Sequence, residues 1–242
     1  MRSKISKIGI IGGSGVEELL FTKGFRNQTV ETNFGEVVVR EGQAKGKTIV
    51  FLNRHGWKYT APSLVDYRAN VSAMKKAGVS VILATAAVGS LSKKLRPGDL
   101  VILDDFIDFT RQRDCVINPN DFFDLSCPYS PFLINKITDA AQALKLEIEP
   151  GVTYACMEGP RFETRAEIRM LKKLGADVVG MTQVPEVVLA AELGIPYAVI
   201  GVITNFAAGI TSKRVSGAEV LVTMKDKSSV LSQMLLKVIE AL

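Results

Sequence analysis

The chain has 242 residues, enough for one α/β domain with a large buried core or for two small domains. Apolar residues make up 47% of it and charged residues 23%, ordinary globular values that exclude disordered and fibrous proteins. No apolar run is long enough to span a bilayer, so no membrane partner is expected. The formal charge of +5 suits a small anionic substrate, whereas basic residues scattered without a dense patch argue against a nucleic-acid partner.

Three cysteines, Cys115, Cys127 and Cys156, occur at spacings typical of neither a zinc site nor a disulfide framework. The basic start is followed by an apolar stretch that is too short and too glycine-rich for a secretory signal. An odd cysteine count without such a signal indicates reduced thiols. We therefore expect a cytoplasmic protein with no metal site.

Residues 7–13 have the pattern of a buried strand, and residues 16–20 that of a short helix. The turn at residues 12–15, Gly-Gly-Ser-Gly, lies between them and exposes backbone amides and a hydroxyl that suit a bound oxyanion. A nicotinamide cofactor is a weaker alternative. The turn lacks the third glycine of a dinucleotide-binding fingerprint, and no clear strand carries an acid at the required distance.

Residues 28–53 predict antiparallel strands joined by a turn at residues 45–47, Lys-Gly-Lys. The second strand runs directly into Arg54 and His55, the only histidine of the chain. Polar side chains at such a strand end commonly face a ligand, and the planar arginine fork suits phosphate. We predict a functional role for both residues.

Residues 63–77 predict an amphipathic helix whose apolar stripe is assigned to the core. The stripe consists of Leu64, Tyr67, Val71 and Met74. Residues 79–87 form a continuous apolar run, as expected for a central parallel strand covered on both faces.

Residues 100–103 predict a further strand, whereas residues 104–131, with Phe122 and Phe123, predict a long irregular segment. A segment of this kind is usually functional or an interface. Regular alternation follows, with helices predicted at 132–146, 163–174, 185–193 and 216–242, and strands at 152–157, 176–182 and 196–205.

This alternation predicts an α/β fold with a mainly parallel, partly mixed central sheet flanked by helices, forming one domain over residues 1–242. Ligands of such folds bind at the carboxyl ends of strands, where the unusual polar turns of this chain lie. The residues of these turns form two groups that differ in chemistry. The first is an oxyanion cradle made of Ser14, Arg54, His55, the amides of Ala86 and Ala87, and Thr182. The second is a heterocycle pocket made of Phe162, Glu163 and Asn205.

Six motifs stand in a fixed order along the chain. They are Ile-Gly-Gly-Ser-Gly at 11–15, Arg-His-Gly at 54–56 with Pro62 and Asp-Tyr-Arg-Ala-Asn at 66–70, Ala-Val-Gly-Ser-Leu at 87–91, Pro-Gly-Asp at 97–99, Glu-Gly-Pro-Arg-Phe-Glu-Thr at 158–164, and Gly-Met-Thr at 180–182 with Pro-Glu at 185–186. Together they resemble the trimeric purine nucleoside phosphorylase and 5′-methylthioadenosine phosphorylase family over essentially the whole chain.

The resemblance implies reversible phosphorolysis, in which inorganic phosphate displaces a purine from C1′ of a nucleoside. Phosphate is then a co-substrate, and no cofactor is needed. The resemblance also implies a homotrimer, or a hexamer built from trimers, with Phe122 or Phe123 reaching into a neighbouring site. The implied phosphate ligands are Ser14, Arg54, His55, Ala87 and Thr182. Met181 would pack under the ribose, and Phe162 would stack near the base.

Residues 204–207 distinguish between purines. Methylthioadenosine phosphorylases of this family have Thr-Asp-Tyr-Asp there, whereas this chain has Thr-Asn-Phe-Ala. An Asn resembles the branch that cleaves inosine and guanosine, where Glu163 would accept from N1–H and Asn205 would bridge O6 and N7. Adenine presents a bare lone pair at N1 to that carboxylate, which costs about 1–3 kcal/mol or more. We therefore predict a 6-oxopurine nucleoside as substrate, with Asn205, Glu163 and His55 as catalytic residues.

The 5′ end of the sugar is less constrained by the sequence. The inosine- and guanosine-cleaving branch commonly has a histidine near the start of the final helix, but residues 215–218 of this chain are Val-Ser-Gly-Ala. The family also has a second histidine a few residues after the first, and Tyr59 stands at about that place. A small apolar lining suits a methylthio group, so inosine, guanosine and 5′-methylthioinosine all stay candidates. Two other functions stay open: a 5′-methylthioadenosine phosphorylase that tolerates Asn205, and a non-catalytic nucleoside-binding homo-oligomer.

Overall fold

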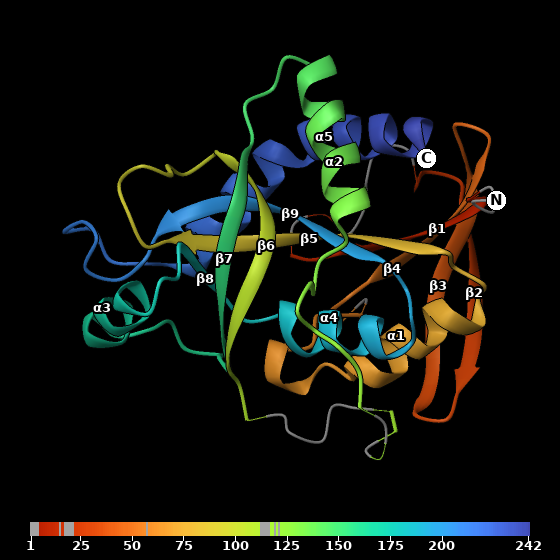
Figure 1. Cartoon of the computed structure of the whole chain (residues 1–242), viewed down its shortest axis with the longest axis horizontal. Coiled ribbons are helices and arrows are strands. Elements are labelled where there is room, and N and C mark those ends of the chain that lie inside the picture. Colours follow the sequence, from red (N-terminus) through yellow and green to blue (C-terminus); the bar gives the residue numbers. More distant parts are fainter. Residues whose placement is uncertain are drawn as a thin grey trace.

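A mixed sheet of nine strands runs through the molecule, with helices on both of its sides (Figure 1). The structure, a computed structural model, describes residues 5–14, 16, 22–56, 58–111, 117–118, 120 and 122–242. The strands in these ranges are β1 (Lys7–Gly12), β2 (Arg26–Thr32), β3 (Gly35–Ala44), β4 (Lys47–Asn53), β5 (Val81–Ser90), β6 (Leu100–Phe109), β7 (Glu149–Met157), β8 (Val178–Gly180) and β9 (Tyr197–Phe206). The helices are the 3-10 turn η2 (Pro62–Leu64), α1 (Tyr67–Lys76), α2 (Pro131–Ala143), α3 (Arg165–Lys173), α4 (Gln183–Glu192) and α5 (Gly217–Ala241).

The strand order is β2-β3-β4-β1-β5-β8-β7-β6-β9, and β9 returns to pair with β5. The five strands from β5 to β9 therefore close into a ring, whereas β2, β3, β4 and β1 extend from it as an open sheet. Among the described strands, five pairings are parallel and four are antiparallel. This confirms the predicted α/β class with a partly mixed sheet flanked by helices.

Two layers of helices enclose the centre of the sheet. Helices α2 and α5 pack together on one side of it, and α1 and α4 pack together on the other (Figure 1). Strands β5 and β9 lie between these layers, and almost all of their side chains are buried. Both faces of β5 are covered, which explains the continuous apolar run at residues 79–87. The predicted central strand is confirmed.

Strand β6 corrects one prediction. Residues 104–109 were expected to be irregular, yet they continue β6, which pairs with β7 as far as Phe109. The sequence signal failed because Asp104, Asp105 and Asp108 interrupt the apolar run of a buried strand. These aspartates are exposed, since this half of β6 leaves the core. Beyond β6, the described residues before α2 form no helix or strand, as predicted.

The start of α1 corrects a second prediction. The Asp66 carboxylate caps the helix by accepting from a first-turn backbone amide at 2.9 Å, so α1 begins at Tyr67. Leu64 lies before this cap and is 74% exposed, so its assignment to the core is wrong. Val71 and Met74 are buried with Tyr67, as expected. The apolar periodicity of the sequence simply continues past the true helix start.

Two elements are shorter than predicted, which affects the polar residues beside them. Helix α3 starts at Arg165, so Glu163 lies in the loop that precedes it. Strand β8 ends at Gly180, so Thr182 lies in the connection to α4. Of the helix predicted at residues 16–20, only the first residue is described.

One edge of β5 is interrupted at its centre. Strand β1 pairs with residues 81–84 of this edge, and β8 pairs with residues 89–90 from the opposite direction. Residues 85–88 have no strand partner on that edge among the described residues, although β9 pairs along the other edge. The neighbouring strands diverge here, and such a point is where α/β sheets commonly bind ligands.

Candidate active site

A cavity of about 620 Å³ opens at the interruption of β5. Its wall combines the turns after β1 and β4, the backbone of β5, the chain around β8, the end of β9 and the first turn of α5. Nine of the twelve residues given a role from the sequence lie on this wall: Ser14, Arg54, His55, Ala87, Phe162, Glu163, Met181, Thr182 and Asn205. Ala86, Phe122 and Phe123 do not lie on it.

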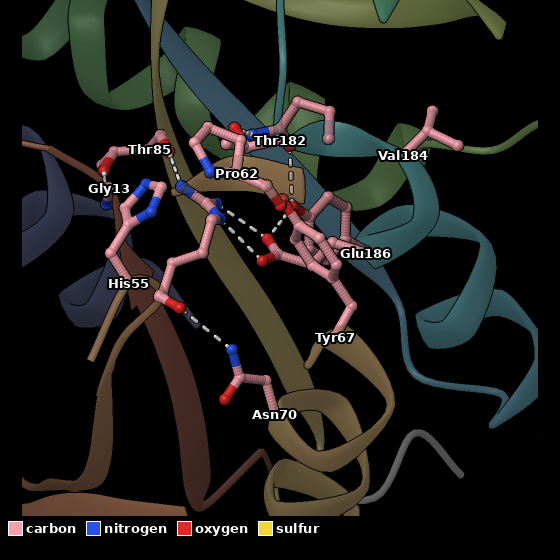
Figure 2. A network of polar contacts seen from close by, with 12 residues as sticks. Gly13, His55, Pro62, Tyr67, Asn70, Thr85, Thr182, Val184 and Glu186 are labelled. Atoms are coloured by element: carbon pink, nitrogen blue, oxygen red, sulfur yellow. Dashed lines mark hydrogen bonds and ion pairs between the residues drawn. The ribbon is translucent and has the colours of Figure 1, made fainter. Parts of the chain in front are cut away.

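Arg54 supplies a buried positive charge, with 2% of its surface exposed. Its Nε and Nη2 donate to the two carboxylate oxygens of Glu186 at 2.7 and 2.8 Å, and its Nη1 donates to the Thr85 carbonyl at 3.0 Å (Figure 2). Burial favours the neutral form of the side chain, but the charge and hydrogen bonds of Glu186 outweigh it. The pKa of Arg54 is consequently raised, and the wall carries a permanent cation.

His55 and Tyr59 form a stacked pair beside this cation. Their ring centroids are 4.7 Å apart and their planes differ by 19°. His55 Nδ1 donates to the Thr60 carbonyl at 2.8 Å, because a carbonyl can only accept. The Tyr59 hydroxyl lies 3.2 Å from Ser14 Oγ, so the pair connects the turn after β4 with the turn after β1.

Thr182 reaches the cavity because β8 runs antiparallel to β5. The chain that leaves β8 therefore runs back along the interrupted edge, on the same wall as Ala87. The Thr182 amide donates to the Tyr154 hydroxyl at 3.1 Å, which fixes the backbone of this turn. A cation, hydroxyls and strand-edge backbone thus converge on one part of the wall, a donor set that suits an oxyanion.

Glu163 is a buried acid without a counter-charge at hydrogen-bond distance. It is 8% exposed, and its Oε1 has no hydrogen-bond partner among the described residues. Burial raises the pKa of Glu163 above its ordinary value of 4.5, and the negative charge of Glu167 adds to this, against a backbone hydrogen bond and Arg161. Buried carboxylate oxygens are normally paired, so this one marks a position where a donor from a ligand fits.

The Glu163 loop is held by the start of α3. Thr164 caps the helix: its hydroxyl accepts from the Glu167 amide at 3.2 Å, and the Glu167 carboxylate accepts from the Thr164 amide at 2.7 Å. Arg161 adds two hydrogen bonds to the same carboxylate at 2.7 and 2.9 Å. These bonds brace the loop on both sides of Glu163.

Asn205 is buried at the end of β9 with a defined amide orientation. Its Oδ1 accepts from the Thr204 hydroxyl at 2.8 Å, and its Nδ2 donates to the Phe206 carbonyl at 3.1 Å. An amide has two donors and an acceptor with two lone pairs, so each end of Asn205 keeps capacity for a ligand. Glu163 and Asn205 lie on the same cavity wall.

The remaining wall is apolar. Met181 follows β8, and Gly217, Val220 and Leu221 come from the first turn of α5. Gly159 has a φ of +71°, which favours glycine, and a Cβ built there would lie 2.6 Å from Met181 Sδ, so a larger residue would be strained and would displace the end of the methionine side chain. Of residues 215–218, where a small lining was expected, only Gly217 lies on the wall, and the aliphatic side chains there are Val220 and Leu221.

Several residues of the site have no role assigned from the sequence. Thr85 accepts from the Gly13 amide at 3.2 Å through its hydroxyl and from Arg54 through its carbonyl, and Glu186 pairs with Arg54. Tyr59 was noted only as standing in place of a histidine. The sequence pattern places Thr85 only at the end of a predicted strand, and an acid directly after a proline within an apolar helix is a usable signal for Glu186.

Neither metal-binding clusters nor membrane spans occur in the described parts of the chain. Groups of three or more His, Cys, Asp or Glu that could hold a metal ion are absent among these residues. None of the described helices has the length and apolar character needed to cross a membrane.

Comparison with known proteins gives related sequences and structures. A sequence profile of the phosphorylase superfamily matches residues 7–240. A Thermococcus kodakarensis protein named "Probable 6-oxopurine nucleoside phosphorylase" is 47% identical, with 97% of this chain and 92% of that protein covered. A Methanopyrus kandleri protein named "Probable S-methyl-5'-thioinosine phosphorylase" is 42% identical, with 87% and 82% covered. The solved structure of methylthioadenosine phosphorylase from Schistosoma mansoni in complex with adenine has a TM-score of 0.92 at 31% identity, with 98% of this chain and 91% of that chain covered.

Proposed function

The chain belongs to the phosphorylase superfamily, and from this membership we propose that it catalyses the reversible phosphorolysis of 6-oxopurine nucleosides. Inosine, guanosine and 5′-methylthioinosine are the proposed substrates, and inorganic phosphate is the co-substrate. The products are the free base and ribose 1-phosphate or its 5-methylthio derivative. No further cofactor is proposed.

The unpartnered Glu163 Oε1 carries this proposal. A 6-oxopurine has a hydrogen on N1 that an ionised carboxylate accepts, whereas adenine has only a lone pair there. Leaving the buried carboxylate unpaired against adenine costs about 1–3 kcal/mol or more. A site built around a hydrogen bond therefore discriminates strongly against a substrate that lacks the donor.

Asn205 complements Glu163 on the other edge of the base. With its Oδ1 turned to Thr204, its Nδ2 can donate to O6 and its Oδ1 can accept from a protonated N7. Negative charge flows onto the purine as the bond from C1′ to N9 breaks, and these contacts strengthen as that charge develops. Such preorganised stabilisation is commonly the largest contribution to catalysis.

Phosphate is proposed to bind to Arg54, His55, Ser14, Thr182 and the Ala87 backbone. An oxygen of hydrogen phosphate forms the new bond to C1′ while the electron pair of the C1′–N9 bond leaves with the purine. The purine takes up a proton at N7, which is balanced by the proton that hydrogen phosphate loses as it becomes the sugar 1-phosphate. Because phosphate itself is the nucleophile, the protein mainly orients two reactants and neutralises charge. Met181 is proposed to pack under the sugar, and Phe162 to stack near the base.

The 5′ substituent is proposed to contact the first turn of α5. Val220 and Leu221 present aliphatic side chains there, and Gly217 presents none. A methylthio group gains from burial against such a surface. This supports 5′-methylthioinosine beside inosine and guanosine.

A homotrimer, alone or paired into a hexamer, is proposed for the assembly. The exposed fractions of Tyr59, Phe162 and Leu221 are 55%, 39% and 50% although all three line the cavity. Apolar groups exposed around a binding site suit coverage by a neighbouring subunit. A cytoplasmic location is proposed as well, because Cys127 and Cys156 are free thiols.

The test is phosphate-dependent release of free base. Purified protein is incubated with inosine, guanosine and 5′-methylthioinosine, with and without phosphate, beside an Arg54→Met variant. We expect release only with phosphate and loss of at least about 100-fold in kcat/KM in the variant, since a charged contact to phosphate is removed. Absence of turnover with every nucleoside in the unmodified protein would favour the nucleoside-binding homo-oligomer instead.

A 5′-methylthioadenosine phosphorylase is the second candidate, and one observation favours it. Burial raises the pKa of Glu163, and a neutral carboxylic acid can donate to the bare N1 of adenine. The two candidates differ in the protonation state of Glu163 that they require, and matched 6-oxo and 6-amino substrates distinguish them.

A further inference from the structure

The buried ion pair of Arg54 and Glu186 links distant parts of the chain. Glu186 lies on α4 and is fully buried, and its side chain and that of Arg54 are 0% and 1% exposed. The two hydrogen bonds are parallel, one to each carboxylate oxygen, at 2.7 and 2.8 Å (Figure 2). This bidentate arrangement fixes the plane of the guanidinium as well as its position.

The hydrogen bonds of Arg54 leave two of its N–H donors without a partner among the described residues. A guanidinium has five N–H donors, of which Glu186 takes two and the Thr85 carbonyl takes one. Counted over the described residues, one N–H on Nη1 and one on Nη2 are left. A Cβ built on Gly13 would lie 2.7 Å from Nη1, so the fork lies directly against the glycine turn of the cavity wall.

A second layer holds Glu186 itself. The Tyr197 hydroxyl, on β9, donates to Glu186 Oε1 and lies 2.7 Å from Gln183 Oε1. Gln183 follows Thr182 directly, so α4 carries both the holder of Arg54 and the neighbour of a proposed phosphate ligand. The network therefore joins two sides of the proposed phosphate site through one helix.

We propose that Glu186 is a positioning residue for phosphate: it holds the Arg54 fork so that the two remaining donors face the anion. The inference rests on the proposed phosphorolysis and adds a role for a residue that does not line the cavity. A buried ion pair is often no more stable than a well-packed apolar pair of similar volume, so stability alone does not account for it. The need to orient the free N–H donors of Arg54 does account for the buried pair.

Phosphate binding measured without nucleoside tests the role. Inorganic phosphate is titrated calorimetrically into the unmodified protein and into Glu186→Gln, whose amide cannot accept both hydrogen bonds. The expected result is a rise in the phosphate Kd of about 10- to 100-fold, as for loss of a charged hydrogen bond. The KM for nucleoside at saturating phosphate is expected to change less than about twofold, because Arg54 is not among the residues proposed to bind the base.

Two further variants separate positioning from loss of stability. Leu235→Ala opens a cavity in the core on α5, away from the site, and is expected to lower the Tm while leaving the phosphate Kd within about twofold. Tyr197→Phe keeps the carboxylate but removes its second donor, and is expected to raise the phosphate Kd about two- to fivefold. It decides the question if Glu186→Gln does not fold.

The outcomes are distinct. An unchanged phosphate Kd in folded Glu186→Gln, or in Tyr197→Phe when the former does not fold, overturns the inference. Equal weakening of phosphate and nucleoside binding overturns it too, since that indicates a general structural defect. Phosphate binding that weakens as expected, in a protein that cleaves none of the nucleosides, supports the role of Glu186 and contradicts the proposed function alone. No phosphate binding in the unmodified protein contradicts both.

Discussion

Arg54 and Glu163 are both buried charged side chains on one cavity wall, and they differ in their partners. Arg54 is paired twice with Glu186, whereas Glu163 Oε1 has no partner among the described residues. Burying an unpaired charge is costly, so it persists where a ligand completes it. At the scale of single residues, Arg54 has its counter-charge within the protein, whereas Glu163 Oε1 is proposed to receive its hydrogen-bond donor from the substrate.

The substitution Glu163→Gln tests whether Glu163 receives its hydrogen bond from the substrate. The amide keeps the shape but loses the charge that accepts from N1–H, so kcat/KM for inosine is expected to fall about 10- to 100-fold. The phosphate Kd is expected to stay within about twofold, because the oxyanion part of the wall is unchanged. Steady-state kinetics and calorimetry measure the two quantities. An equal loss of both would show that Glu163 supports the whole site rather than the base.

The protonation of Glu163 predicts a pH dependence. Burial raises its pKa, and cleavage of a 6-oxopurine requires the ionised form, so kcat/KM is lost as the pH falls through this raised pKa. The loss therefore begins at a higher pH than for an ordinary glutamate. A pH profile of inosine cleavage is expected to show this inflection in the unmodified protein. The same inflection in Glu163→Gln would assign it to another group.

At the scale of elements, the N-termini of two helices lie next to residues of the cavity wall. Thr164 caps α3 beside Glu163, which is proposed to bind the base, and Ser216 caps α5 beside Gly217, which is proposed to lie near the 5′ end of the sugar; Ser216 accepts from the Glu219 amide at 3.3 Å. Both are hydroxyl caps of the same kind, so each serves as a control for the other.

Removing each cap is expected to affect a different end of the substrate. Thr164→Ala and Ser216→Ala each lose about 1 kcal/mol of cap stabilisation, and the Tm falls by roughly 2–4 °C. Thr164→Ala is expected to raise KM for inosine and 5′-methylthioinosine alike, because the Glu163 loop loosens. Ser216→Ala is expected to change the ratio between these two substrates. Kinetics with both nucleosides measure this, and a reversed pattern would contradict the assignment of the two walls.

The sequence predicts some of these elements well and others poorly, for physical reasons. The polar turns at Ser14, Arg54 and Asn205 follow strands whose apolar runs are clear, so their convergence at the sheet follows from the α/β pattern. The strand at residues 104–109 is missed because its exposed aspartates lack that pattern. The Glu186 pairing is missed because it joins residues 132 positions apart, and periodicity carries no information about such pairs.

At the scale of the whole molecule, the cavity opens where one edge of β5 is interrupted within the closed ring of described strands. The direction of β8, antiparallel to β5 and parallel to β7, was not predicted from the sequence. Its direction brings Thr182 back along the interruption. Exposed apolar side chains around this opening are the basis for the proposed assembly.

The assembly predicts a mass and a contact. Sedimentation is expected to give three times, or six times, the chain mass of 26.3 kDa. Phe122 is fully exposed, and if it completes a neighbouring site, Phe122→Ala lowers kcat/KM roughly tenfold without changing the mass. Leu174→Ala, at an exposed apolar position beyond α3, is the matched control. A monomer with full activity would contradict the proposed assembly.

The most direct measurement compares 5′-methylthioinosine with 5′-methylthioadenosine at saturating phosphate in the unmodified protein. The two substrates share the sugar and its 5′ group, and they differ at C6 and in the hydrogen on N1. If Glu163 selects for that hydrogen, kcat/KM is expected to be at least about tenfold higher for 5′-methylthioinosine near neutral pH. An equal or higher value for 5′-methylthioadenosine would contradict a 6-oxopurine phosphorylase.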